Sequence, residues 1–203
     1  MGSVTPNVHD LVQIDAAVFA AEHDDAPAWV KPSLQWAPWA VVRREHGGKR
    51  VPIGVRGQQR AQRYATSISV NDVLARIEPH DACPAAARAE GRLGDASRSI
   101  TEFASFNHII WGPVGSFGFE LASGRKATTS QSDLDIVVGV ATVARETLLA
   151  LQQLCASIAA RHGVTVDVEL AFDVGGVALA EYATQPLRVL AKTARGPKLL
   201  PCP

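Results

Sequence analysis

The chain has 203 residues, of which 20 are basic, 20 are acidic and 47% are hydrophobic. At about 150 residues per domain, this length predicts one large or two small domains. The apolar content excludes a disordered chain. The zero formal charge excludes a protein that binds nucleic acid through a general positive excess.

Neither a targeting segment nor a disulfide framework is predicted. The N-terminus carries no basic cluster, and Asp10 and Asp15 interrupt any apolar core of a signal peptide. The three cysteines are odd in number and far apart, so they indicate neither disulfides nor a zinc site. The most apolar stretch, around 136–144, is far shorter than the roughly 20 residues that span a bilayer. We expect a cytoplasmic protein without a membrane segment.

Residues 1–80 predict a small α+β lobe, because Pro, Trp and short β-rich runs dominate them. The runs 40–44 and 51–55 flank Gly47-Gly48, which is typical of a β-hairpin. A short helix is expected over Ser69–Ile77. Residues 81–96 are rich in Ala, Arg and Gly and predict a linker between two lobes.

Residues 97–203 alternate between helical and strand patterns and predict a second, larger lobe. Ser97 is expected to cap a helix whose apolar face includes Ile100, Phe103, Ala104 and Ile110. Further helices are expected over 117–122, before Gly124, and over 142–161, before Gly163. Strands are expected over 133–138 and 164–171.

The sharpest chemical signal is Gly115-Ser116 followed by Asp133-Leu134-Asp135 and by Asp167 on a later strand. Side chains alternate along a strand, so Asp133 and Asp135 share one face and can share a cation. Asp167 would add a third carboxylate if its strand lies beside theirs. Carboxylates with phosphate and water oxygens suit Mg²⁺, and one or two ions would serve an in-line displacement. Gly115 lets the backbone approach a phosphate, which the Ser116 hydroxyl can bind.

Two alternatives accompany this interpretation. A lone Asp-x-Asp is usually part of a surface turn, but here it lies in an apolar β-run where two carboxylates are costly unless exposed or bound to metal. Glu169 shares the face of Asp167 and rivals it as the third ligand.

The Gly-Ser, Asp-x-Asp and strand-Asp constellation resembles the nucleotidyltransferase superfamily of the polymerase-β type. A closer likeness covers nearly the whole chain. Six runs of the sequence are similar to the phosphoribosyl-dephospho-CoA transferases of malonate decarboxylase, also called its holo-acyl-carrier-protein synthases. In the second half these runs are 111–122 (WGPVGSFGFELA), 132–135 and 192–197, and in the first half they are 9–12, 37–44 and 54–63.

This resemblance implies a small N-terminal α+β lobe and a C-terminal nucleotidyltransferase lobe with a mixed sheet. It also implies an enzyme that moves 2′-(5″-phosphoribosyl)-3′-dephospho-CoA from its triphosphate precursor, 2′-(5″-triphosphoribosyl)-3′-dephospho-CoA, to a serine of the decarboxylase's acyl carrier subunit. The resemblance implies that pyrophosphate is released. Asp133, Asp135 and Asp167 would hold Mg²⁺ or Mn²⁺, and Asp167 would help to deprotonate the serine.

A donor with three phosphates gives the basic residues a role. Arg56, Arg60 and Arg63 fall on one short segment, where their guanidinium groups would bind the donor's phosphates or face the acidic carrier. The alternative is a set of solvated surface arginines. Lys192 is a candidate for binding the leaving pyrophosphate.

Two rival functions remain open at this point. One is a nucleotidyltransferase of the same fold with another acceptor, against which the run 111–122 and the matched N-terminal half argue. The other is a non-catalytic module that binds a carrier protein. Because Asp133, Asp135 and Ser116 are all present, inactivity would need another cause.

Overall fold

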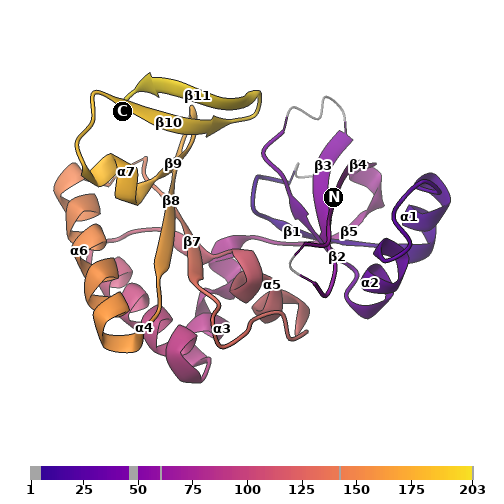
Figure 1. Cartoon of the computed structure of the whole chain (residues 1–203), viewed down its shortest axis with the longest axis horizontal. Helices are drawn as coiled ribbons and strands as arrows, with labels where there is room; N and C mark the ends of the chain where they lie inside the picture. Colours follow the sequence, from indigo (N-terminus) through magenta and orange to yellow (C-terminus); the bar gives the residue numbers. More distant parts are fainter. Residues whose placement is uncertain (1–5, 46–49, 60, 142, 203) are drawn as a thin grey trace. The chain divides into compact units, whose positions relative to one another are not determined.

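The computed structural model of the chain describes residues 6–45, 50–59, 61–141 and 143–202. These residues form two compact units, coloured indigo to magenta and magenta to yellow in Figure 1. The first unit comprises the chain up to Glu78 with Ala122–Arg125, and the second comprises Pro79–Leu121 and the chain from Lys126. The two-lobe α+β class expected from the sequence is confirmed.

The first unit is a five-stranded antiparallel sheet with two short helices. The strands lie in the order β4-β3-β2-β1-β5. Its elements, in chain order, are β1 (Leu11–Ile14), α1 (Ala16–Glu22), α2 (Val30–Trp36), β2 (Trp39–Val42), β3 (Arg50–Arg56), β4 (Arg63–Ser69), the 3-10 turn η1 (Val70–Asp72) and β5 (Val73–Ile77).

Buried and partly exposed side chains alternate along the strands of this unit, and the buried ones form its core. Val51, Ile53 and Val55 of β3 are buried while the residues between them are partly exposed. They pack with buried side chains of α1 and α2, such as Phe19 and Leu34. The predicted pairing of 40–44 with 51–55 is confirmed as the antiparallel pair β2–β3, whereas its turn at Gly47-Gly48 lies outside the described residues.

The helix expected over Ser69–Ile77 is wrong. Ser69 ends β4 and caps the single turn η1, accepting the N–H of Asn71, and the chain then continues as β5. β5 pairs with β1, with Leu11 opposite Ile77. Cross-strand pairing to a distant segment therefore overrides the local helical pattern.

The second unit is a six-stranded sheet in the order β11-β10-β9-β8-β7-β6. Among the described strands only β7 and β8 run parallel, joined by α6, so the expected mixed sheet is confirmed. The elements are η2 (Pro79–Ala82), α3 (Cys83–Arg88), α4 (Gly91–Phe106), β6 (Trp111–Pro113), α5 (Gly115–Ser123), β7 (Leu134–Gly139), α6 (Arg145–His162), β8 (Val166–Phe172), β9 (Gly175–Ala178), α7 (Leu179–Ala183), β10 (Arg188–Thr193) and β11 (Gly196–Pro201).

The helices of this unit agree only in part with the expected ones. α6 ends as predicted, with Gly163 in the left-handed conformation. α4 begins six residues before Ser97, so Ser97 is buried in the middle of the helix and does not cap its N-terminus. Ile110 lies beyond the end of α4 and is 70% exposed, so it is not part of the apolar face of the helix. Residues 81–96, expected as a linker, form the end of η2, α3 and the first turns of α4. No helix in the described part is both long and apolar enough to cross a membrane.

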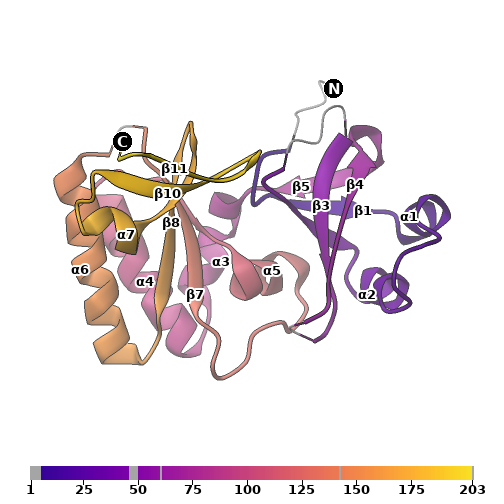
Figure 2. The ribbon, with the colours of Figure 1, turned by 45° about the horizontal axis from the view of Figure 1, so that its top comes forward.

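The two faces of this sheet differ in character. Figures 1 and 2 show α4 and α6 on one side of β7 and β8, where Leu134, Ile136 and Leu170 are buried. The alternate residues point to the other side, which we call the polar face. It is defined by Asp135 on β7, Asp167 and Glu169 on β8, and Lys192 on β10.

Candidate active site

Two of the three predicted aspartates lie side by side on the polar face. β7 and β8 are parallel neighbours, and Asp135 is the register partner of Asp167. Paired residues of adjacent strands point to the same face and are separated by about 4.8 Å across the strands. Asp167 is exposed and Asp135 is partly exposed. Both carboxylates can therefore contact one bound cation or phosphate-bearing ligand.

The turn from β6 into α5 is built around Asp135. The N–H of Val114 donates to the backbone oxygen of Asp135 over 2.9 Å. Gly115 follows with φ +62, and a Cβ there would lie 2.0 Å from Oδ2 of Asp135. Only glycine thus admits both the left-handed backbone and the carboxylate. Ser116 lies in the first turn of α5, whose N-terminal N–H groups favour negative charge.

Asp133 follows a loop that Glu120 organises. It directly precedes β7 and is exposed. Glu120 on α5 accepts the N–H groups of Ala127 and Thr128, both over 2.8 Å, and the hydroxyl of Thr128 over 2.7 Å. Its other oxygen accepts from Nζ of Lys126 over 3.0 Å. The side chain is only 22% exposed.

Burial of Glu120 raises the pKa of its carboxyl, but the hydrogen bonds from Ala127, Thr128 and Lys126 lower it more. The net effect lowers the pKa from 4.5 to about 2. The carboxylate is therefore ionised across the physiological range. It fixes the first half of the loop that leads to Asp133.

Arg92 on α4 fixes the end of the same loop. Its guanidinium donates to the backbone oxygen of Ser132 over 2.8 Å and to that of Gly163 over 2.7 Å. Ser132 in turn accepts the N–H of Thr129 through its hydroxyl over 2.8 Å. Arg92 thus ties the residue before Asp133 to the end of α6. Sequence reasoning missed both Arg92 and Glu120, although Glu120 lies in the run 111–122.

Glu169 forms an ion pair with Lys192. Nζ of Lys192 lies 3.0 Å from Oε2 of Glu169. The pair reaches from β8 to β10 across β9, where a Cβ on Gly176 would come within 2.3 Å of the Glu169 carboxyl group. The Glu169 side chain is 12% exposed, against 63% for Lys192. Lys192 therefore lies on the polar face with the aspartates, as a substrate-binding role would require.

The basic segment of the first unit lies at the turn of the hairpin formed by β3 and β4. Arg56 ends β3, Arg63 begins β4, and the two are register partners. Gln62 orders the turn between them, because its side-chain oxygen accepts the N–H of Gln59 and its backbone oxygen accepts that of Gly57, both over 3.0 Å. Arg60 lies outside the described residues.

The carboxylates that could hold a metal ion are arranged as a pair rather than as a closed set of ligands. Within the described residues, no three or more His, Cys, Asp or Glu side chains are gathered closely enough to hold an ion. Asp135 and Asp167 share a register position on the polar face. Mg²⁺ commonly takes one or two carboxylates and completes its shell with water and phosphate oxygens. The donor set therefore fits an ion that is bound together with a phosphate-bearing substrate.

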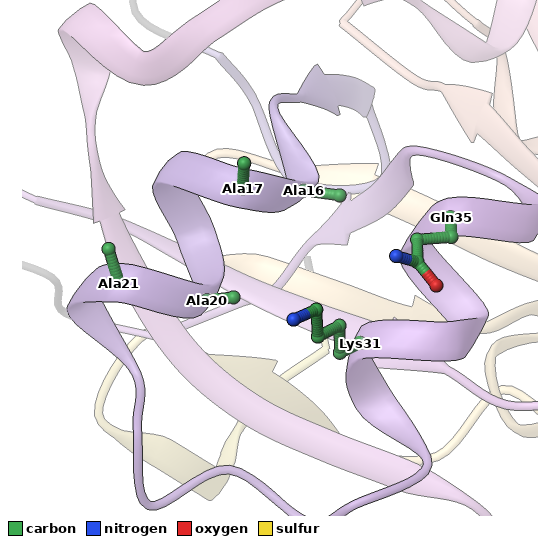
Figure 3. Close-up of a pocket in the computed structure, with 6 residues that line it drawn as sticks. All are labelled: Ala16, Ala17, Ala20, Ala21, Lys31 and Gln35. Atoms are coloured by element: carbon green, nitrogen blue, oxygen red, sulfur yellow. The ribbon is translucent and has the colours of Figure 1, made fainter.

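A hollow of about 570 Å³ lies between α1 and α2 in the first unit (Figure 3). Small side chains of α1 line one wall, and Lys31 and Gln35 of α2 line the other. None of the predicted site residues contributes to it.

Two family models match the chain almost end to end. The model described as "Phosphoribosyl-dephospho-CoA transferase MdcG N-terminal domain" matches residues 7–79, and the corresponding C-terminal domain model matches residues 74–203. The chain belongs to the phosphoribosyl-dephospho-CoA transferase family, a family of transferase enzymes. The resemblance drawn from the sequence is confirmed.

Individual relatives carry the same name. The chain is 36% identical to the phosphoribosyl-dephospho-CoA transferase of Pseudomonas syringae pv. tomato over 199 residues, which cover 96% of this chain and 92% of the relative. The Pseudomonas aeruginosa enzyme is 35% identical, covering 98% and 93%, and the Klebsiella pneumoniae enzyme is 31% identical, covering 99% and 97%. No solved structure is significantly similar to the chain.

Proposed function

We propose that this member of the family transfers 2′-(5″-phosphoribosyl)-3′-dephospho-CoA from its triphosphate precursor to a serine of the acyl carrier subunit of malonate decarboxylase. Pyrophosphate is the other product, and the reaction takes place in the cytoplasm. The observation that carries the proposal is the pairing of Asp135 with Asp167 on the polar face, beside the Gly115 turn. Membership in a transferase family over almost the whole chain supports it.

The transfer is a displacement at phosphorus. The oxygen of the acceptor serine forms a bond to the α-phosphorus, and the bond from that phosphorus to the leaving pyrophosphate breaks. The proton of the serine hydroxyl passes to a carboxylate of the polar face, for which we propose Asp167. The Gly115 turn and the hydroxyl of Ser116 bind a phosphate of the donor at the start of α5.

Mg²⁺ or Mn²⁺ is the cofactor that we propose. Asp135 and Asp167 would hold the ion as a pair, and Asp133, which lies just before β7 and is not gathered with them in the described structure, would join them as a further ligand. The close packing of the Asp135 carboxylate against Gly115, which fixes where that carboxylate lies, and the register pairing with Asp167 support this assignment. When bound, such an ion neutralises charge on the attacking and leaving oxygens.

Asp167 is favoured over Glu169 as the metal ligand by what each carboxylate contacts. Glu169 is largely buried and forms an ion pair with Lys192 over 3.0 Å. Asp167 is exposed and stands at the same register as Asp135. Glu169 instead positions the Lys192 ammonium, which we propose binds the pyrophosphate as it leaves.

Arg56 and Arg63 are proposed to bind further phosphates of the donor. Their register pairing places two guanidinium groups at the same end of one hairpin, and planar guanidinium matches phosphate in geometry and charge. Arg60 is proposed for the same role from its place in the sequence between them.

The test is mass spectrometry of a purified carrier subunit after incubation with the enzyme, Mg²⁺ and the triphosphate donor. We expect the wild-type enzyme to add the mass of phosphoribosyl-dephospho-CoA to one serine and to release one pyrophosphate per transfer. Asp135→Asn keeps the side-chain volume but removes the charge, so its transfer rate should fall at least about a hundredfold. Asp24→Asn, an exposed aspartate of the first unit, is the matched control and should transfer at the wild-type rate.

Two outcomes would overturn the proposal. A carrier serine that gains no mass with the wild-type enzyme would exclude this acceptor. A fully active Asp135→Asn variant would exclude the carboxylate pair as the catalytic centre.

A further inference from the structure

The last two strands concentrate positive charge in a chain whose overall formal charge is zero. We call β10 and β11 (Arg188–Pro201) the C-terminal hairpin; it is drawn in yellow in Figure 1. It contains Arg188, Lys192, Arg195 and Lys198 and no acidic residue, whereas the whole chain has 20 basic and 20 acidic residues. A local excess of this kind attracts negatively charged partners.

One face of the hairpin exposes two leucines to solvent. Leu190 and Leu199 are register partners, and they are 49% and 51% exposed. The residues on either side of Leu190, Val189 and Ala191, are completely buried. The leucine pair is therefore not part of the core, and Leu187 just before the hairpin is 93% exposed.

The cations around the leucine pair are only partly balanced. Lys192 is paired with Glu169, and Glu181 of α7 accepts the N–H of Leu190 over 2.8 Å. The guanidinium of Arg188 donates to the backbone oxygen of Leu199 over 2.7 Å, which leaves its charge uncompensated. Over the described part of the chain, Arg188 and Arg195 have no carboxylate partner.

The leucine pair lies on the same face of the sheet as the candidate active site. Lys192 is the register partner of Gly176, and Gly176 is that of Ala171. Ala171 follows Asp167 by four residues on β8, so their side chains share a face. Leu190 precedes Lys192 by two residues and shares that face too. The polar face thus extends from Asp135 and Asp167 to the leucine pair and the basic residues of the C-terminal hairpin.

We propose that this surface of the C-terminal hairpin docks the acceptor protein, through an acidic, amphipathic segment beside the serine that is modified. The inference rests on the proposed function, because it presumes a protein acceptor. The leucine pair takes the apolar side of the segment, while Arg188 and Arg195 attract its carboxylates. The continuity of the face brings the acceptor serine towards Asp135 and Asp167.

The edge of the sheet argues for docking on this face rather than for the addition of a strand. β11 is the outermost strand, and it carries Pro197 and Pro201, which have no N–H to offer to an added strand. A partner is therefore held by side chains of the face.

Two double variants of the full-length enzyme test the proposal by steady-state transfer kinetics. Arg188→Glu/Arg195→Glu reverses the charge, and Leu190→Ser/Leu199→Ser removes the apolar pair. The matched controls are Arg161→Glu at the exposed end of α6 and Leu74→Ser, which is 62% exposed on β5. The carrier subunit is varied at saturating donor, and the donor is then varied at saturating carrier. Titration calorimetry measures carrier binding without donor.

We expect each double variant to raise the KM for the carrier and its Kd about tenfold or more, with the KM for the donor unchanged. The charge-reversal effect should shrink between about 0.1 M and about 1 M salt, as the Debye length falls from roughly 10 Å to 3 Å. Controls should match the wild type.

The inference fails if the wild-type enzyme modifies the carrier while both double variants keep the wild-type KM for it. It also fails if the variants raise the KM for the donor instead, since the surface would then bind the donor. If the wild-type enzyme itself does not modify the carrier, the proposed function fails, and carrier binding by calorimetry then tests the docking surface separately.

Discussion

Glu120 provides the sharpest test of how the site is held together. One carboxylate oxygen accepts three hydrogen bonds from residues 127 and 128, and the other accepts from Lys126. We predict that Glu120→Gln destabilises the fold at neutral pH and slows transfer. The amide presents an N–H₂ group where the loop offers only donors, so the loop that leads to Asp133 loses its anchor.

The magnitude follows from the lowered pKa of Glu120. A fall from 4.5 to about 2 is worth at most about 3–4 kcal/mol of folding free energy, at 1.36 kcal/mol per pKa unit. Screening by water at this partly exposed group reduces the expected difference to roughly 1–2 kcal/mol. Because the folded-state pKa is depressed, this stabilisation is present above about pH 4.5 and is lost as the pH falls towards about 2.

The assay is urea unfolding of the wild type and Glu120→Gln at pH 7, 4 and 2.5, with Glu102→Gln as the control. Glu102 is an exposed residue of α4, and its substitution should change the unfolding free energy by less than about 0.5 kcal/mol. The gap between wild type and Glu120→Gln should be full at pH 7 and should close as the pH falls. A gap of the same size at pH 7 and pH 2.5 would refute the role of the charged carboxylate.

Three further predictions concern other parts of the second unit. Asp167→Asn should lower the transfer rate at least about a hundredfold, and Glu169→Gln only mildly; carrier modification measures both, and the reverse order would make Glu169 the ligand. Ser97→Ala should raise the unfolding free energy, measured in urea, by about 1 kcal/mol. The buried hydroxyl of Ser97 has no hydrogen-bond partner in the described structure, and Ala favours helix. A lower unfolding free energy of the variant would contradict this. Burial raises the pKa of Cys155 to about 11. Iodoacetamide at pH 8 should therefore label this cysteine only after the enzyme is unfolded. Peptide mapping that finds Cys155 labelled in the folded enzyme would disprove the prediction.

The part of the site that the sequence predicted is the part that local periodicity controls. The apolar run after Asp133 predicted β7, and the alternation of 164–171 predicted β8 with Asp167 on its polar side. Their parallel pairing, with Asp135 opposite Asp167, agrees with the condition under which the third carboxylate was proposed. The helix between them and its stop at Gly163 follow from helical spacing and from the left-handed conformation of that glycine.

The part that the sequence could not predict depends on contacts between distant residues. Residues 73–77 have a pattern that also suits a helix, and their pairing with residues 11–14 decides for a strand. Arg92 contacts Ser132 and Gly163, which are 40 and 71 residues away, so no local pattern marks it. The ion pair of Glu169 with Lys192 likewise bridges 23 residues.

These long-range contacts show how an exposed residue such as Asp133 would be held in a fixed position for the role that we propose. Asp133 lies outside the regular pairing of β7, so the ladder alone does not orient it. Glu120 and Arg92 instead secure the loop at both ends, through residues 126–128 and through the backbone of Ser132. A catalytic carboxylate displaced by about 1 Å can cost on the order of a hundredfold in rate. Loss of either anchor should therefore impair transfer more than it impairs binding of the donor, since Gly115 and Asp135 are positioned independently by the turn into α5.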